Sequence, residues 1–273
     1  MSDYVRQNSV EIKYEHGDSW AILNPIEQSK KEKIEKYGTP LKDWDIQINY
    51  GVKTGLNEAF IIDEETRDKL VKADPKSAEL IRPILRGKDI KRDGYEFKDL
   101  YVILAYFGSH KIIPTQYPAI YEHLKGFEKK LKQRGQCRYT SSGKPNSNGE
   151  YPGQHHWLEL DNNPRQTYMD DFNRQKIMFS RISGNEPCFA LDNDGYMTND
   201  TGYIITGNNL EYLLEQLTSD VIWFAFRRFY MGGGIEKEFK VNNLASLPIP
   251  LPNTHPIELT DEEINFISSS VKP

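Results

Sequence analysis

One short segment of the chain places a cation, a hydroxyl and an amide between glycines. It runs Gly51-Val52-Lys53-Thr54-Gly55-Leu56-Asn57. Glycine permits backbone angles that other residues resist, and loops held on a rigid sheet are common binding elements. A lysine-threonine pair also occurs in nucleotide phosphate loops, but the GxxxxGK[ST] spacing is absent here. The segment therefore predicts either a binding loop or a turn with a solvated lysine.

A second group of cations surrounds another glycine. The run Arg86-Gly87-Lys88-Asp89-Ile90-Lys91-Arg92 holds four cations in seven residues, and Asp93-Gly94 follows as a turn signal. Arginine and lysine near a bend suit contacts with a phosphate backbone, although a solvated loop has the same composition. Between Lys111 and Lys144 there are eight lysines and arginines against two glutamates, on a chain of net charge −5. A local basic face on an acidic chain is compatible with a polyanion partner and also with a solvated helix.

Several catalytic patterns are missing. There is no GxGxxG for a dinucleotide and no GxSxG nucleophile elbow. Asn24-Pro25-Ile26 lacks the second proline of the element with which DNA amino-methyltransferases hold a flipped base. The acids Asp170-Asp171 and Glu236-Lys237-Glu238 follow no convincing strand, as a metal-dependent nuclease would need. We interpret them as surface acids and predict no catalytic residue in this chain.

Metal-ligand spacing is absent as well. His155 and His156 are adjacent, so in an extended segment their side chains point to opposite faces, and no third ligand stands at a recognisable distance. Cys137 and Cys188 fit no metal spacing and favour a reducing cytoplasm. We predict no metal ion and no cofactor in the chain.

The elements that must position these residues follow from hydrophobic periodicity. Trp44–Ile48 alternates as a half-buried strand and Ala59–Ile62 is a continuous apolar run, so the central loop is predicted to join them as a hairpin. The other predicted helices are 29–37, 64–73, 77–85, 114–134, 210–230 and 260–268, and the other strands are 100–106, 176–182, 187–191, 202–206 and 238–241. Residues 247–252 are expected to be extended. The fold class is α+β, with mixed or antiparallel sheets, flanking helices and a long helix at about 210–230.

Composition sets further bounds. The 273 residues are 37% hydrophobic and 27% charged. The sequence contains no run of 18 apolar residues, the length needed to span a membrane. The first residues are polar, without the pattern of a signal peptide, which favours the cytoplasm. The polar stretch at 135–153 is long for a loop in a compact domain, and loops of that length are often functional.

Several stretches together carry a family resemblance. They are INYGVKTGLNEAFIID, DPKSAELIRPILRGKDIKR, LYVI, HHWLEL, KIMFSRIS, EPCFALDNDGYMTNDTGYIITG and GGGIEKEFKVNNLASLPIP, in this order between Asp45 and Pro252. In this the chain resembles the TaqI-like C-terminal specificity domain. That family is the target-recognition part of fused type II restriction–modification enzymes and of related phage-defence adenine methyltransferases.

The resemblance implies recognition of a double-stranded DNA sequence for an adenine-N6 methyltransferase. The catalytic region would lie N-terminal in the same polypeptide or complex and would hold S-adenosylmethionine, and whether it also holds Mg is left open. Residues 1–43 are then a connector with a short helix, 44–252 the recognition domain with a sub-boundary left open near 135–155, and 253–273 a tail helix. An alternative is a protein-interaction module that docks on a methyltransferase without base readout. A stand-alone hydrolase would need an acid pair or nucleophile that the sequence does not display.

The resemblance also implies a set of DNA-facing residues. It places Lys53, Thr54, Asn57, Arg86, Lys88 and Arg92 near the DNA-facing surface. Side chains of the type that reads base edges occur in and beside the long polar loop, namely Gln133, Arg134, Arg138, Asn146, Asn148 and Gln154. Lys144, Arg181 and Lys237 complete the predicted DNA-binding set.

Overall fold

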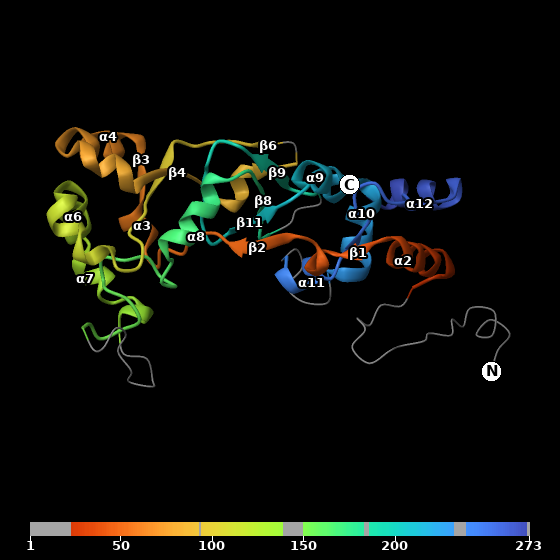
Figure 1. The fold of residues 1–273 in the computed structure, drawn as a ribbon, viewed down its shortest axis with the longest axis horizontal. Helices are drawn as coiled ribbons and strands as arrows, with labels where there is room; N and C mark the ends of the chain where they lie inside the picture. Colours follow the sequence, from red (N-terminus) through yellow and green to blue (C-terminus); the bar gives the residue numbers. More distant parts are fainter. Residues whose placement is uncertain (1–22, 93, 139–149, 183–185, 232–238, 272–273) are drawn as a thin grey trace. The chain divides into compact units, whose positions relative to one another are not determined.

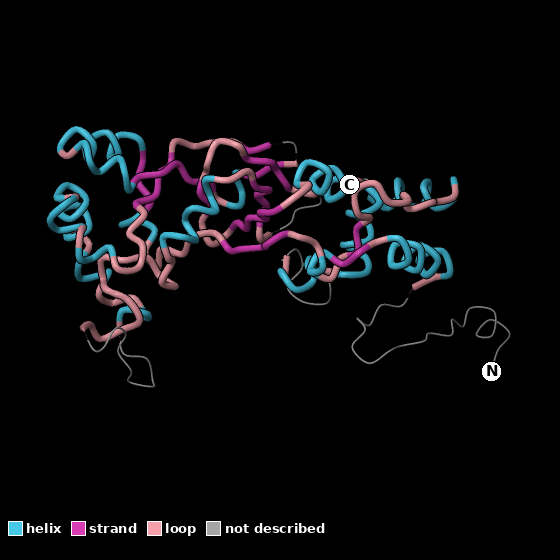
Figure 2. The backbone as a smooth tube through the Cα atoms, viewed as in Figure 1, coloured by secondary structure: helices cyan, strands magenta, loops and turns pink. Residues whose placement is uncertain are grey.

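The computed structural model describes residues 23–92, 94–138, 150–182, 186–231 and 239–271. The chain divides into two compact units. Unit 1 comprises residues 1–46, 183–187 and 211–273, and unit 2 comprises residues 47–182 and 188–210. Helices and strands are mixed along the chain, as Figures 1 and 2 show, and the α+β class is confirmed.

Unit 2 contains a four-stranded sheet of order β10-β4-β7-β3. Its strands are β3 (Ile61–Asp63), β4 (Ile81–Leu85), β7 (Leu100–Ile103) and β10 (Met197–Thr198). Strand β7 pairs antiparallel with both β3 and β4, whereas β10 pairs parallel with β4. Helices α4 (Glu64–Ala73) and α6 (Pro118–Lys125) lie beside this sheet (Figure 1), and their apolar residues join its core.

A second sheet of unit 2 has the order β2-β11-β8-β9. Its strands are β2 (Ile46–Tyr50), β8 (Lys176–Ser180), β9 (Phe189–Asp192) and β11 (Gly202–Gly207). The predicted strands at 176–182, 187–191 and 202–206 are therefore confirmed to within a few residues. The short strands β5 (Ile90–Lys91) and β6 (Gly94–Tyr95) form a ribbon. Short helices complete the unit: α3 (Asn57–Phe60), α5 (Ile113–Gln116), α7 (Glu128–Leu131) and α8 (Gln166–Asp170).

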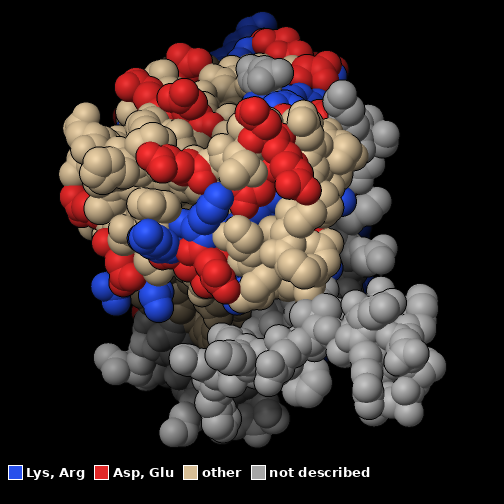
Figure 3. All heavy atoms as spheres, turned by 90° about the vertical axis from the view of Figure 1, so that its right-hand side faces the viewer, with Lys and Arg blue, Asp and Glu red and all other residues tan. Residues whose placement is uncertain are grey.

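Unit 1 is built mainly from helices. They are α2 (Pro25–Tyr37), α10 (Asp220–Ala225), α11 (Val241–Ala245) and α12 (Asp261–Val271), and the short strands β1 (Thr39–Pro40) and β12 (Pro248–Ile249) pair antiparallel. Apolar residues of α2, α10 and α12 share one cluster, which includes Ile34, Phe224 and Ile267. Acidic and basic side chains are intermixed on the side of this unit that Figure 3 shows. The predicted connector and tail helix thus belong, in their described parts, to the same unit.

The helix caps of unit 1 follow from local sequence. Thr260 and Glu263 exchange backbone and side-chain hydrogen bonds at the start of α12, so the predicted capping box is confirmed. Helix α2 begins at Pro25, four residues earlier than predicted, because Asn24 accepts from the Glu27 N–H and Glu27 returns a bond to the Asn24 N–H. This second capping box, followed by a proline at the first helical position, was readable in the sequence.

The predicted hairpin around the central loop is wrong. Strand β2 pairs in one sheet and β3 in the other, so the two are not partners. The chain is diverted because the N–H groups of Gly51 and Val52 donate to the carbonyls of Gly202 and Thr198, at 2.9 and 2.7 Å. Residues predicted to begin the second strand, Ala59 and Phe60, instead end the helical turn α3.

Two predicted helices also differ. Residues 77–85 do not form an α-helix, because a 3₁₀ turn (Pro75–Leu80) is followed by strand β4. Strand β4 pairs with β10 only from Ile84 onward, so Pro83, which has no N–H to donate, is tolerated on that side. The predicted helix 114–134 is divided into α5, α6 and α7. Pro118 supplies no N–H to continue α5, and Gly126 ends α6. The apolar stripe is nevertheless correct, since Tyr117, Ile120, Leu124 and Leu131 are all buried.

The predicted helix at 210–230 is helical in three consecutive segments, α9 (Leu210–Thr218), α10 and a π-helical turn over Phe226–Tyr230. The interruption comes at Ser219, whose hydroxyl accepts from the Ile222 N–H as the cap of α10. The predicted strand at 238–241 is wrong in its described part, because Val241 begins α11. Within the described residues, no helix has the length and apolar character to cross a membrane.

Candidate functional site

The central loop lies against two other parts of unit 2, and both of its glycines are required there. A Cβ at Gly51 would lie 2.0 Å from the carbonyl oxygen of Asn199. Gly55 has a φ of +69°, and a Cβ there would lie 2.4 Å from a carboxylate oxygen of Asp161. The backbone of the loop therefore lies close to Asn199 and to the Asp161 carboxylate, and the two glycines serve this packing rather than flexibility.

Arg134 is the centre of the contacts beneath this loop. The side chain is buried, and its five N–H groups all donate within the chain. The acceptors are the carbonyls of Leu131, Thr54, Trp157 and Glu159 and the Oδ1 atom of Asp161, at distances from 2.7 to 3.2 Å. Since a guanidinium has five donors, no donor remains for a base edge in this conformation. Arg134 acts here as an internal tie between the loop and residues 157–161.

His155 continues the same network. Its Nε2 atom lies 3.0 Å from Asp161 Oδ1, and Nδ1 lies 2.9 Å from the carbonyl of His156 and 3.6 Å from the sulfur of Cys137. Burial alone lowers the pKa of His155, but the bonds to Asp161, Cys137 and His156 outweigh it and raise the pKa to about 9. Asp161 therefore faces two cations, Arg134 and protonated His155. We refer to Arg134, His155 and Asp161 as the internal cluster.

His156 has different surroundings from His155. Its ring stacks on that of His110 at 4.6 Å, and Nδ1 of His110 lies 2.6 Å from the buried carboxylate of Glu159. Burial, reinforced by the nearby His110, lowers the pKa of His156 to about 4. Among the described residues, no three histidine, cysteine or acidic side chains are grouped to hold a metal ion.

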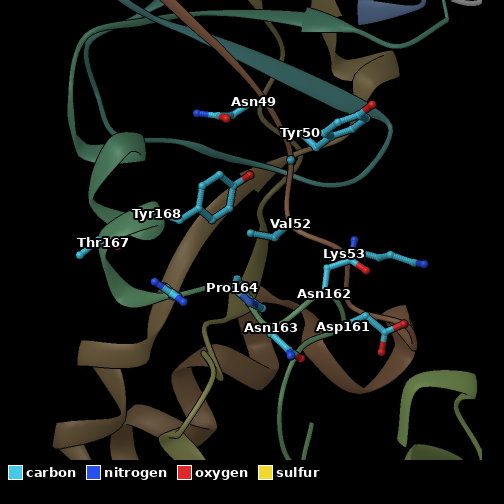
Figure 4. Close-up of a pocket in the computed structure, with 12 residues that line it drawn as sticks. Asn49, Tyr50, Val52, Lys53, Asp161, Asn162, Asn163, Pro164, Thr167 and Tyr168 are labelled. Carbon is cyan, nitrogen blue, oxygen red and sulfur yellow. The ribbon is translucent and has the colours of Figure 1, made fainter. Parts of the chain in front are cut away.

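A pocket of about 420 Å³ opens beside the central loop (Figure 4). It is lined by residues 49–53 and by 161–165, 167 and 168. Asp161 is common to this pocket and to the internal cluster. Two neighbouring asparagines of the lining, Asn162 and Asn163, adopt left-handed backbone conformations with φ of +66° and +49°. Figure 4 shows Tyr168 and Lys53 on opposite sides of the buried Val52.

The lining differs from the internal cluster in its hydrogen bonding. The Oδ1 atom of Asn163 is buried and has no partner among the described residues. In that part of the chain, the phenol oxygen of Tyr168 and the charged groups of Lys53 and Arg165 also make no hydrogen bond or ion pair. Burial raises the pKa of Tyr168, so its hydroxyl remains a donor.

The predicted site residues are distributed over these environments. The exposed ones are Asn57, Lys88, Gln133, Arg138, Gln154 and Arg181, the half-buried ones are Lys53, Arg86 and Arg92, and the buried ones are Thr54 and Arg134. Lys144, Asn146, Asn148 and Lys237 lie outside the described residues. The structure brings Lys53, Thr54, Asn57 and Arg134 to one loop: Thr54 donates to Asn57 at 2.5 Å and its carbonyl accepts from Arg134.

Arg86 is engaged inside the chain as well. Its Nε and one terminal nitrogen donate to the two carboxylate oxygens of Asp89 at 2.8 and 2.9 Å, and the Asp89 side chain is 4% exposed. Lys88, two residues along, is exposed, and its side chain forms no hydrogen bond or ion pair with any described residue.

Several pocket residues were not anticipated from the sequence. They are Tyr50, Asp161, Asn163, Arg165 and Tyr168. One signal was present: Asp161-Asn162-Asn163-Pro164 combines the residue types that favour tight turns and left-handed backbone. No signal brought this turn next to residues 49–53, because that proximity arises from tertiary packing.

The comparisons with known proteins agree with the resemblance in the sequence. Residues 82–249 match the TaqI-like C-terminal specificity domain. Because this match covers more than half of the chain, the chain belongs to that family. No curated protein matches it.

Two solved structures match parts of this chain. The type IIL restriction-modification enzyme MmeI, solved in complex with DNA, is 13% identical with a TM-score of 0.49, over 77% of this chain and 25% of its own. The type IIG restriction endonuclease BpuSI is 14% identical with a TM-score of 0.47, over 90% of this chain and 28% of its own. The chain spans about a quarter of the length of each enzyme.

Proposed function

We propose that this chain recognises a specific double-stranded DNA sequence for a restriction–modification adenine-N6 methyltransferase. The observation that carries the proposal is membership of the specificity-domain family over residues 82–249. The catalytic region, with its S-adenosylmethionine and any Mg²⁺, lies outside this chain in the proposal. This chain then contributes the choice of sequence and no catalytic residue, and it acts on DNA in the cytoplasm.

The geometry supports contacts with a phosphate backbone. Lys53, Lys88, Arg138 and Arg165 reach the surface, and none makes an ion pair with another described residue. Such cations can meet phosphates without breaking an internal bond, whereas Arg134 and Arg86 would have to leave their partners. The net charge of −5 limits the affinity of the chain alone, so the methyltransferase region supplies further phosphate contacts.

The test is a selection of duplexes from a random library by the full chain at fixed salt. We expect one enriched sequence that binds more tightly than its scrambled versions, with affinity that falls as salt is raised. Lys53→Gln should weaken binding to all duplexes, whereas Lys129→Gln, which removes an exposed cation away from the pocket, should have less effect. Equal affinity for enriched and scrambled duplexes would overturn the proposal.

A second experiment separates base readout from a docking role. Residues 135–153 are exchanged for the corresponding segment of another member of the family, and the exchanged chain is assayed together with its methyltransferase region. A recognition domain predicts methylation at a changed sequence. A docking module predicts that methylation keeps its sequence or is lost together with assembly.

A further inference from the structure

The pocket beside the central loop has the size and walls of a small-molecule site. Its volume of about 420 Å³ falls within the roughly 300–1,000 Å³ of ordinary ligand pockets. Tyr50 and Tyr168 contribute two phenol rings, and each of them contacts another aromatic ring. Tyr50 packs on Tyr203 at 4.9 Å, and Tyr168 packs edge-on against Phe172 at 5.5 Å. Flat aromatic faces of this kind stack on nucleobases regardless of sequence.

The lining also offers both kinds of hydrogen-bonding group. The buried Oδ1 atom of Asn163 is an acceptor without a partner among the described residues. Tyr168 is half-buried, and its hydroxyl is a donor that bonds to no described residue. Buried polar atoms are rarely left unpaired, so an unsatisfied one indicates a bound water or ligand. The edges of a nucleobase present donors and acceptors together, which matches this pair.

Two cations complete the lining. Lys53 and Arg165 both border the pocket, and within the described chain neither is paired with an acid. Arginine and lysine are the usual contacts of a phosphate. The pocket therefore combines groups for a planar heterocycle with groups for an anion.

We propose that this pocket holds one unstacked nucleobase together with its phosphate, between Tyr168, Asn163 and the cations Lys53 and Arg165. The inference rests on the proposed recognition of DNA and assigns one nucleotide of the target to a defined place in the chain. The same chemistry is shared by a base extruded from a duplex and by a free nucleotide. Extrusion is easiest for an unpaired or mismatched base, which provides a means to distinguish the two sources.

The first arm of the test uses the four deoxynucleoside monophosphates, with deoxyribose 5-phosphate and inorganic phosphate as references, in calorimetric titrations of the full chain. At least one mononucleotide should bind ten or more times more tightly than deoxyribose 5-phosphate. Tyr168→Phe keeps the ring and removes the hydroxyl, and should weaken binding by about 2- to 12-fold, the effect of one hydrogen bond. Asn163→Gly keeps the left-handed backbone and removes the amide, with a similar loss.

Matched controls exist for both substitutions. Tyr121→Phe removes a phenol hydroxyl outside the pocket, and Asn209→Gly removes the amide of another left-handed asparagine of unit 2, with φ of +57°. Neither control should change binding. If the controls weaken binding as much as the pocket variants do, the assignment of the pocket is wrong.

The second arm compares three duplexes of the selected sequence: fully paired, with one unpaired base, and with one abasic position. A base extruded from DNA predicts the tightest binding to the unpaired-base duplex, and Tyr168→Phe should reduce that preference. Binding of mononucleotides without such a preference supports the same pocket with a free nucleotide as occupant. If no mononucleotide binds and both pocket variants bind all three duplexes as the unaltered chain does, the inference is overturned, while selective duplex binding would leave the proposed function standing. If no duplex is bound selectively, the proposed function itself fails.

Discussion

Arg134 and Arg165 belong to the same unit but have opposite relations to the rest of the chain. Arg134 is 6% exposed, and its five N–H groups donate to acceptors in three segments: Leu131, Thr54 of the central loop, and residues 157–161. Arg165 is exposed at the edge of the pocket, and no described residue pairs with its guanidinium. Asp161 lies between the two regions, since it binds Arg134 and also lines the pocket.

The contrast shows that residue type alone does not separate binding cations from structural ones. A guanidinium whose N–H groups all donate within the chain stabilises the conformation of the loop. Moving it away from its acceptors would cost the free energy of several buried hydrogen bonds. A guanidinium without partners can be removed at little cost to the fold, and it can meet an anion without rearrangement. The internal cluster thus holds the loop in place, and the pocket lining remains available to a ligand.

The largest effect is expected from Arg134→Met. The substitution removes one of the two cations that face the Asp161 carboxylate and leaves several buried carbonyls without their donor. Breaking a buried ion pair on one side costs about 3–5 kcal/mol. Urea denaturation would measure this loss. Arg165→Met is the matched control, and its free energy of unfolding should stay within about 0.5 kcal/mol of the unaltered chain. Similar losses for both variants would contradict the distinction between the two regions.

The internal cluster also makes stability depend on pH. The pKa of His155 is raised from 6.5 to about 9, so its contribution is fully present below about pH 6.5 and is lost as the pH rises through 9. The shift corresponds to about 3 kcal/mol. The pKa of His156 is lowered to about 4, so its contribution is present above pH 6.5 and is lost as the pH falls through 4.

Unfolding free energies measured from pH 4 to 10 should therefore decline on both sides of about pH 6.5. His155→Gln should flatten the alkaline decline and leave the acidic one. His255→Gln, at an exposed position of unit 1, should keep both. An alkaline decline that persists in His155→Gln would show that another group causes it.

Much of the fold could be predicted because periodicity acts locally. The strands at 100–103, 176–180 and 202–207 and the helix at 64–73 are where alternation and amphipathic spacing place them. The predicted hairpin is wrong because Gly51 and Val52 form hydrogen bonds with residues 198–202, which direct the chain away from a hairpin. No local sequence pattern encodes these tertiary bonds. The helix at 77–85 failed because pairing with β7 outweighed a helical pattern that already contained Pro83.

The site was harder to predict because engagement of a side chain depends on distant residues. Lys53 and Arg134 have the same sign of charge and were grouped together, but Arg134 meets acceptors up to 80 positions away. Arg86 shows that some of this information was local: Asp89 follows three residues later, at the spacing that allows a two-point ion pair. The pocket required two segments more than a hundred residues apart, and so was beyond local reasoning.

The smallest changes in unfolding free energy are expected at Arg86 and Lys88, which repeat within one short segment the contrast between an engaged and an unpaired cation. Arg86→Ala removes the guanidinium that pairs with the Asp89 carboxylate and leaves that carboxylate its bond from the Arg86 N–H. The substitution should cost about 1–3 kcal/mol of unfolding free energy. Lys88→Ala should change stability by less than about 0.5 kcal/mol, because its exposed side chain bonds to no described residue.

For DNA binding we expect the opposite ranking, with a larger effect of Lys88→Ala than of Arg86→Ala. A lysine that neutralises one phosphate contributes about one to the slope of log affinity against log salt, so Lys88→Ala should reduce that slope by about one. Arg86→Ala should leave the slope unchanged once binding is measured where the variant is fully folded. If Arg86→Ala instead lowers the slope, its guanidinium must exchange Asp89 for a phosphate when DNA binds. Pairing inside the unbound chain would then no longer identify a structural cation, and the same measurement on Arg134→Lys would be needed to show whether the internal cluster opens as well.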